Sequence, residues 1–286
     1  MDAKREISEF LKTRRARLTP EQAGIQTYGL NRKVQGLRRE EVALLAGVSV
    51  DYYTRIERGN IAGASPSVLD ALARALQLNE VERDHLNQLA AVAETRKPSR
   101  PVAHLVRSQH QQMLDAIVNT PAYIGNARMD VLATNALCAA LYEPILKSPV
   151  AGRNLARFVF LDPSSVSYWQ NWTKIAEDSA ATLRVMAGKF PNEPQLHQLI
   201  GELVAKSEYF SALWQKQNVY RHGPGEKTMI HPEVGELTFG YEGLVFANDD
   251  YLKMVIYTCE PTSPTAEKLR LLASLAATRL QEPSEL

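Results

Sequence analysis

The outward face of a short helix over residues 50–58 carries side chains that could recognise the edges of DNA bases. Its inward face is set by Tyr53 and Ile56, which are three positions apart and apolar enough to enter a core. A guanidinium can donate paired hydrogen bonds to one guanine, the commonest specific contact between a protein and DNA. We therefore expect Arg55 to contact a base. The other side chains on the same outward face are Val50, Asp51, Tyr52 and Arg58.

A helix over residues 37–46 comes before it, so that the pair forms a helix-turn-helix. Gly47 allows the left-handed backbone that ends a helix, and the Ser49 hydroxyl can cap the next one. The alternative is a helical hairpin that only buries a core. Against it, Gly47, Ser49 and the Ile-Glu-Arg-Gly segment that ends at Gly59 all stand at the positions that a helix-turn-helix requires. In a helix-turn-helix the second helix enters the DNA major groove. We expect the partner to be double-stranded DNA.

Basic residues gather ahead of and within this motif. Residues 12–39 contain eight Lys and Arg but a single acidic residue, Glu21. Cations at the end of a first helix, over residues 3–17, would also suit its dipole, but contact with DNA phosphates accounts for the whole cluster. The full set of residues that we predict to contact DNA is Arg32, Lys33, Arg38, Arg39, Ser49, Val50, Asp51, Tyr52, Arg55 and Arg58.

Length and charge favour two domains. The chain has 286 residues, of which 45% are hydrophobic and 23% are charged. Residues 1–100 hold 17 Lys and Arg against 13 Asp and Glu, whereas the remainder holds 16 against 19. A polar segment with two prolines, residues 95–104, separates the basic part from the acidic part. We predict an all-α helix-turn-helix domain over residues 1–94, completed by helices over 65–76 and 79–93, and a second domain over 105–286.

The second domain mixes helical and alternating apolar patterns, which predicts an α+β fold. Two strands near its start and three near its end would form an antiparallel sheet with helices over one face, an order compatible with a PAS-like domain. The predicted strands cover residues 122–126, 131–134, 227–231, 235–241 and 251–258. The predicted helices cover residues 105–119, 135–142, 153–160, 163–188, 194–206, a short segment containing Phe210 and Trp214, and 264–281.

No combination of residues in the second domain has the spacing of a catalytic or metal site. Gly223-Pro224-Gly225 lacks the lysine and the helix of a phosphate-binding loop, and His222 and His231 have no matched third ligand. Cys138 and Cys259 are the only cysteines, too few for a zinc site made of thiolates. We therefore expect no catalytic residue, no metal and no resident cofactor, and a protein that is not an enzyme.

Nothing in the sequence predicts targeting or membrane insertion. The N-terminus is charged and lacks the apolar core of a signal peptide. No apolar run approaches the ~18 residues that would indicate a membrane span. We expect a cytoplasmic protein without a membrane span.

The second domain has more aromatic residues than its helix packing needs. They could simply fill a large core, but a sheet face opposed by tryptophan-bearing helices is also a plausible wall for an apolar pocket. An acidic ligand would need a cation or a hydrogen-bond donor at the mouth of that pocket. The residues that we predict to contact a ligand are Tyr123, Arg153, Trp169, Trp172, Arg184, Phe210, Trp214, His231, Phe239 and Tyr257.

Several segments together resemble the signature of the MmyB-like transcriptional regulators. They are residues 37–53, Thr120-Pro121-Ala122-Tyr123, residues 130–135, residues 153–155, residues 160–163 and residues 231–237. The resemblance runs from about residue 8 to residue 273. It implies a helix-turn-helix followed by a PAS-like domain that accepts fatty-acid-like molecules.

These observations lead to one expected function and its alternatives. We expect a ligand-responsive bacterial transcription regulator whose second domain binds a small apolar, fatty-acid-like effector. A homodimer is expected because one recognition helix contacts only a few base pairs, and residues 105–119 and 264–281 are candidate dimer surfaces. Alternatively, the second domain serves only for dimerisation or protein interaction, or it is an enzyme.

Overall fold

The computed structural model describes residues 3–25, 34–94, 105–219 and 225–281. The chain divides into two compact units. The first unit comprises residues 1–101, 184–197 and 212–221, and the second comprises 102–183, 198–211 and 222–286. Two segments from beyond the predicted linker are therefore part of the first unit.

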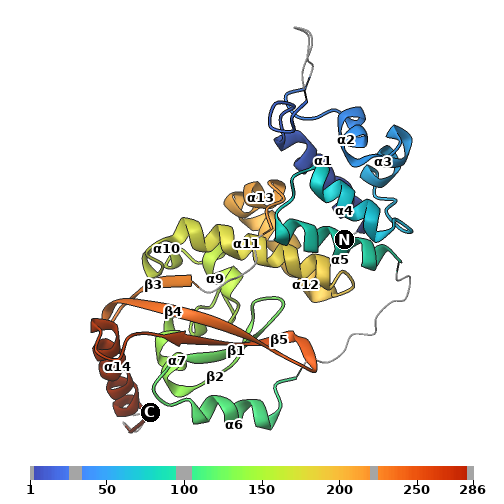
Figure 1. Ribbon diagram of the computed structural model, residues 1–286. Helices are drawn as coiled ribbons and strands as arrows, with labels where there is room; N and C mark the ends of the chain where they lie inside the picture. The colour runs from blue at the N-terminus through green and yellow to red at the C-terminus, as the bar shows by residue number, and fades with distance from the viewer. Residues whose placement is uncertain (1–2, 26–33, 95–104, 220–224, 282–286) are drawn as a thin grey trace. The chain divides into compact units, whose positions relative to one another are not determined.

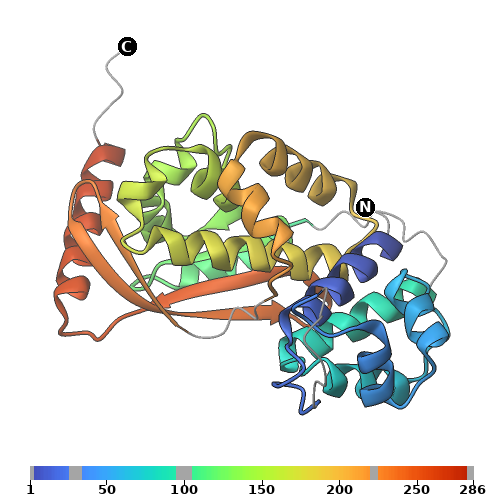
Figure 2. The ribbon, with the colours of Figure 1, turned by 90° about the horizontal axis from the view of Figure 1, so that it is seen from above.

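The first unit is a helical bundle, drawn from blue to cyan in Figure 2 for the part before residue 95. One fully buried residue from each of four helices shows how they share a core: Phe10, Tyr53, Leu72 and Leu86. Val219 is buried in this core, and Val185 packs against it. The helices before residue 95 are α1 (Ala3–Arg17), α2 (Arg39–Ala46), α3 (Val50–Glu57), α4 (Pro66–Ala75) and α5 (Glu80–Glu94).

The second unit is built on a five-stranded antiparallel sheet with the strand order β2-β1-β5-β4-β3 (Figure 1). Each predicted strand is present, and the last three are longer than their alternating patterns indicated. The sheet and its helices confirm the predicted α+β class. The strands are β1 (Ala122–Asn126), β2 (Val131–Thr134), β3 (Gly225–His231), β4 (Gly235–Phe246) and β5 (Asp249–Thr258).

Helices lie on both faces of this sheet, as Figure 1 shows. On one face, Leu114 of α6 (Ser108–Ala116) packs in a cluster with Ile124 and Met254. The last helix, α14 (Pro264–Gln281), packs against α7 (Ala136–Leu141) and β4. The other helices of the region are α8 (Glu143–Leu146), α9 (Leu155–Leu161), α10 (Ser165–Tyr168), α11 (Trp172–Lys189), α12 (Pro194–Lys206) and α13 (Glu208–Gln215).

The predicted helix over residues 163–188 is interrupted, which corrects the sequence-based expectation. α10 ends at Tyr168, and Trp169 forms an isolated β-bridge with Met229 of β3. The Gln170 N–H donates to the Thr228 carbonyl at 3.2 Å, and α11 begins after this contact. The backbone here exchanges helical hydrogen bonds for sheet-edge bonds, while Trp169 stays buried. Because Trp169 is buried as it would be in a continuous helix, hydrophobic periodicity could not predict the interruption between α10 and α11.

No helix in the described part of the chain is long and apolar enough to cross a membrane. The two longest, α11 and α14, each have 18 residues and carry charges along their length. The described residues also contain no group of three or more His, Cys, Asp or Glu placed to hold a metal ion.

Candidate DNA-binding face and ligand cavity

The turn between α2 and α3 has the local geometry that its residues favour. Gly47 has φ 66°, a left-handed conformation that residues with a side chain rarely adopt. The Ser49 hydroxyl accepts the Tyr52 N–H at 3.1 Å and so caps α3. At the start of α2, the Arg38 N–H donates to the Glu41 carboxylate at 2.6 Å. The N-cap residue of α2 is therefore an arginine and not a Ser or Thr, and the Glu41 side chain, three residues later, accepts the hydrogen bond of its backbone N–H.

Glu57, at the end of α3, is the buried carboxylate that joins three helices of the first unit. Its side chain is fully buried and accepts from Arg15 of α1 at 2.5 Å, from Arg39 of α2 and from the Tyr53 hydroxyl at 3.2 Å. Burial alone would raise the pKa of Glu57, but hydrogen bonds from Arg15 and Arg39 lower it on balance. Removing this carboxylate would leave two arginines without their shared partner.

Arg39 therefore has a role that the sequence did not predict. We expected it to contact a base or phosphate; its Nε donates to Glu57, while 42% of the side chain stays exposed. Glu57 itself was missed. An acidic residue four positions after the inward-facing Tyr53 was the available signal, because that spacing places it on the buried side of α3.

The outward face of α3 presents the residues that the sequence assigned to base contact. Val50 is 45% exposed, and Asp51, Arg55 and Arg58 are exposed as well. The Arg55 guanidinium lies over the Tyr52 ring, 4.9 Å from its centroid. Among the described residues, neither Arg55 nor Arg58 forms an ion pair, so both guanidinium groups remain available to an anionic partner.

The remaining predicted DNA contacts divide into three cases. Arg38 is exposed and 3.4 Å from Glu40 on the same helix end. Ser49 is exposed, with its hydroxyl used as the cap of α3. Arg32 and Lys33 lie outside the described residues.

A small cavity of about 30 Å³ lies in the second unit between the sheet and α11. We call it the sheet cavity. Two predicted ligand residues, Tyr123 of β1 and the buried Trp169, line it. Its apolar wall also includes Leu155 and Val159 of α9 and Ile175 of α11.

The sheet cavity has a charged side that the sequence analysis missed. Asp178 of α11, Lys227 of β3 and Lys253 of β5 line it together. Lys227 has the same parity in its strand as the buried Met229 two residues later, and Lys253 has that of the buried Tyr251 two residues earlier. That parity places a charged side chain on a covered sheet face and was the signal available in the sequence.

A second, larger cavity of about 490 Å³ lies along α14, and we call it the α14 groove. Leu269 and Arg270 of α14 face Tyr257 of β5 and Leu137 of α7 across it. Tyr257 is a predicted ligand residue. Its hydroxyl forms a hydrogen bond with that of Tyr142, which lines the sheet cavity.

Three predicted ligand residues instead take structural positions in the second unit and line neither cavity. The Trp172 indole donates to the Val159 carbonyl at 3.0 Å. Phe210 packs edge-on against Phe160, with centroids 4.8 Å apart. Phe239 is fully buried beside Tyr257.

Two polar candidates for an acid headgroup are likewise engaged with the backbone of the second unit. The Arg153 Nε donates to the Val131 carbonyl at 3.2 Å. His231 Nε2 lies 3.2 Å from the Ala140 carbonyl oxygen, while its Nδ1 accepts the Glu233 N–H at 3.3 Å. Neither residue lines the sheet cavity or the α14 groove.

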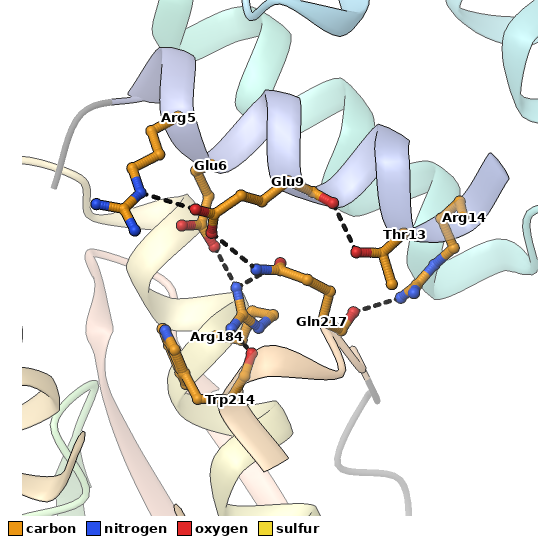
Figure 3. Close-up of polar contacts among 8 residues, drawn as sticks. All are labelled: Arg5, Glu6, Glu9, Thr13, Arg14, Arg184, Trp214 and Gln217. Atoms are coloured by element: carbon orange, nitrogen blue, oxygen red, sulfur yellow. Dashed lines mark hydrogen bonds and ion pairs between the residues drawn. The ribbon is translucent and has the colours of Figure 1, made fainter. Parts of the chain in front are cut away.

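Arg184 and Trp214 belong to the first unit, where Figure 3 shows them beside α1. Arg184 is 1% exposed and donates to Glu6 and to the Gln217 side chain, each at 2.5 Å. Its guanidinium also lies 3.8 Å from the Trp214 ring centroid. Burial lowers the pKa of Arg184, and burial raises that of Glu6. Arg184 is thus fully engaged and does not face a ligand cavity, contrary to our expectation.

Fold and site together define a class: a helix-turn-helix DNA-binding protein with a separate ligand-binding unit. A family model for a helix-turn-helix domain matches residues 6–86, and one for the MmyB-like transcription regulator ligand binding domain matches residues 106–272. Because the second match covers more than half of the chain, the chain belongs to the MmyB-like transcription regulators. No match to a curated protein was found. The family is one of transcription regulators and not of enzymes.

Proposed function

We propose that this transcription regulator binds its operator through α3 and that a fatty-acid-like effector in the sheet cavity sets its affinity for DNA. One observation carries the proposal: a single helix, α11, has residues in both units. Ile175, Asp178 and Thr182 line the sheet cavity, whereas Arg184 of the same helix is bound within the first unit.

The size of the sheet cavity supports a coupling between ligand binding and helix position. Ligand pockets usually measure about 300–1,000 Å³, and this cavity of about 30 Å³ has room for roughly one water molecule. An effector can enter only if the walls separate, and α11 is one of those walls. Such a ligand binds the open and closed states unequally, which is the requirement for shifting an equilibrium between them.

The DNA half of the proposal rests on the face of α3. Arg55 would contact a base, with Val50, Asp51 and Tyr52 beside it, and Arg38 and Arg58 would contact phosphates. We further propose that the protein acts as a homodimer in the cytoplasm. α6 and α14 support a dimer surface, because Met113 and Leu271 on them are 50% and 52% exposed.

We also propose a PAS-like fold for the second unit. Its support is the single antiparallel sheet of order β2-β1-β5-β4-β3, with residues of α9 and α11, which lie between β2 and β3 in the chain, lining a cavity against one face. No resident cofactor is proposed, and the fatty-acid-like molecule is an effector.

The alternative function is a second unit that serves only for dimerisation or protein interaction. This alternative interprets the small volume of the sheet cavity as that of a filled core, which needs no ligand. Native mass spectrometry of the purified protein separates the two. Our proposal predicts a dimer that retains, or takes up when mixed, one C12–C18 fatty acid per chain. A dimer that takes up none, with no change in melting temperature, would establish the alternative.

A further inference from the structure

Lys227 and Lys253 extend from two strands of the sheet toward the same cavity. Lys227 lies opposite Phe239 of β4, and Lys253 lies opposite Gly125 of β1. Residues directly opposite each other on neighbouring strands share a face, which places both lysines on the side where Tyr123 lines the cavity. Both side chains are half-buried.

The two ammonium groups have little in the protein to balance them. Among the described residues, neither has an ion pair or a hydrogen bond; Lys227 lies over the Tyr241 ring, 4.3 Å from its centroid. Asp178 is the acidic residue lining the cavity, and its carboxylate is paired with Lys174 at 3.1 Å. The aromatic contact stabilises one cation but offers nothing to Lys253.

The electrostatic consequences of this arrangement appear in the pKa values. Burial and, to a smaller extent, the charge of Lys253 lower the pKa of Lys227, with Asp178 partly opposing both, and together they bring it to about 8. Burial also lowers the pKa of Lys253. Two like charges in one cavity disfavour each other, and an anion between them would relieve both the repulsion and the loss of hydration.

We propose that Lys227 and Lys253 together bind the anionic group, a carboxylate or a phosphate, of an amphiphilic ligand. The inference rests on the proposed function, since it assumes that the sheet cavity is the effector site. The rest of the ligand is apolar, because Leu155, Trp169 and Ile175 line the same cavity. The pair replaces Arg153, Arg184 and His231, which the structure engages elsewhere.

Matched twelve-carbon probes test the assignment on the full chain. Dodecanoate, dodecyl phosphate and dodecanol are titrated calorimetrically into wild type, Lys253→Met and Lys227→Met. We expect either anion to bind wild type at least about tenfold more tightly than dodecanol, the effect of one charged hydrogen bond. Each variant should lose most of that difference. Lys206→Met, which removes an exposed lysine of α12 paired with Glu202, should keep it.

The melting temperature of each ligand-free variant distinguishes recognition from a structural role. Removing an unbalanced half-buried charge should leave the melting temperature unchanged or raise it, whereas losing a stabilising lysine would lower it. The tighter of the two anions identifies the ligand as a carboxylic acid or a phosphate ester.

Two results would overturn the assignment in different ways. If dodecanol binds wild type as tightly as the anions do, the lysine pair does not recognise the ligand, while an apolar effector site still stands. If none of the three probes binds, the proposed effector function fails, and the lysine assignment fails with it.

Discussion

At the scale of single residues, the DNA-binding surface is a few exposed side chains held by buried ones. Glu57 fixes α3 against α1 and α2 through Arg15 and Arg39, so that Arg55 is presented by a rigid helix. A base contact made from a rigid element loses little side-chain and backbone entropy on binding.

Arg55→Ala should weaken operator binding and relax the preference at one base pair. A paired contact with guanine is worth about 1–3 kcal/mol of discrimination, or roughly a 5- to 150-fold change in affinity. Binding is measured by fluorescence anisotropy at fixed salt, on an operator selected from random DNA and on its single-base variants. Lys206→Ala, which removes an exposed cation of α12 in the second unit, is the control. An unchanged affinity and preference for Arg55→Ala would exclude the base contact.

The lysine pair predicts a pH dependence of anion binding. Lys227 has a pKa lowered to about 8 in the free protein, so it is charged below pH 8 and becomes neutral above it. A bound anion raises this pKa, and binding above pH 8 is accompanied by proton uptake. Lys253, Lys174, Asp178 and Tyr241 are the other titratable groups that face it.

Calorimetric titration of dodecanoate between pH 7 and pH 10 measures this effect. The affinity should fall by up to about tenfold per pH unit above pH 8. Lys227→Arg keeps its charge throughout this range and should bind with a nearly constant affinity. An equal fall in wild type and Lys227→Arg would place the titrating group elsewhere.

At the scale of elements, α11 packs closely on α5. In the first unit, a Cβ at Gly188 would lie 2.7 Å from Cε1 of His85 on α5, which is too close for two carbon atoms. Burial, together with the charges of Arg184 and Arg14, lowers the pKa of His85 to about 3. The ring is therefore neutral and packs edge-on against Phe10.

Gly188→Ala should destabilise the protein by about 1–3 kcal/mol, the usual effect of overpacking a core. Gly201→Ala is a matched control, because Gly201 is exposed in α12 and nothing lies within 4 Å of its added Cβ. Alanine there should be neutral or stabilising by up to about 1 kcal/mol. Urea unfolding measures both variants. Equal midpoints for Gly188→Ala and wild type would show that α11 does not pack closely on α5.

Local signals explain which parts of the structure the sequence could predict. Gly47 and Ser49 act on their immediate neighbours, and alternation identified each strand from a few consecutive residues. The partner of Arg184 is Glu6, 178 positions earlier, a distance that periodicity does not span. The sequence therefore showed Arg184 as an available cation, although the structure buries it.

The same reasoning applies to the candidate ligand site. Tyr123 and Trp169 were found because aromatic residues on a sheet face and a facing helix suggest a pocket wall. Lys227 and Lys253 were missed because a lone lysine in a strand usually points to solvent. Only the pairing of β3 with β4, of β4 with β5 and of β5 with β1 brings both to one face.

At the scale of the whole molecule, the chain combines a DNA-binding domain and a ligand-binding domain of the MmyB-like transcription regulators. The central claim is that a ligand in the second unit changes the affinity of the first for DNA. Linkage requires this effect to be reciprocal, so operator DNA must change the ligand affinity by the same factor.

The most direct test is the operator affinity of the full chain with and without saturating dodecanoate. One preparation of the protein is titrated into the selected operator at constant salt, and occupancy of the ligand site is verified in parallel by calorimetry. We predict that dodecanoate changes the dissociation constant by about fivefold or more, the lower end of usual allosteric coupling. The same dissociation constant with the ligand site fully occupied would contradict the account.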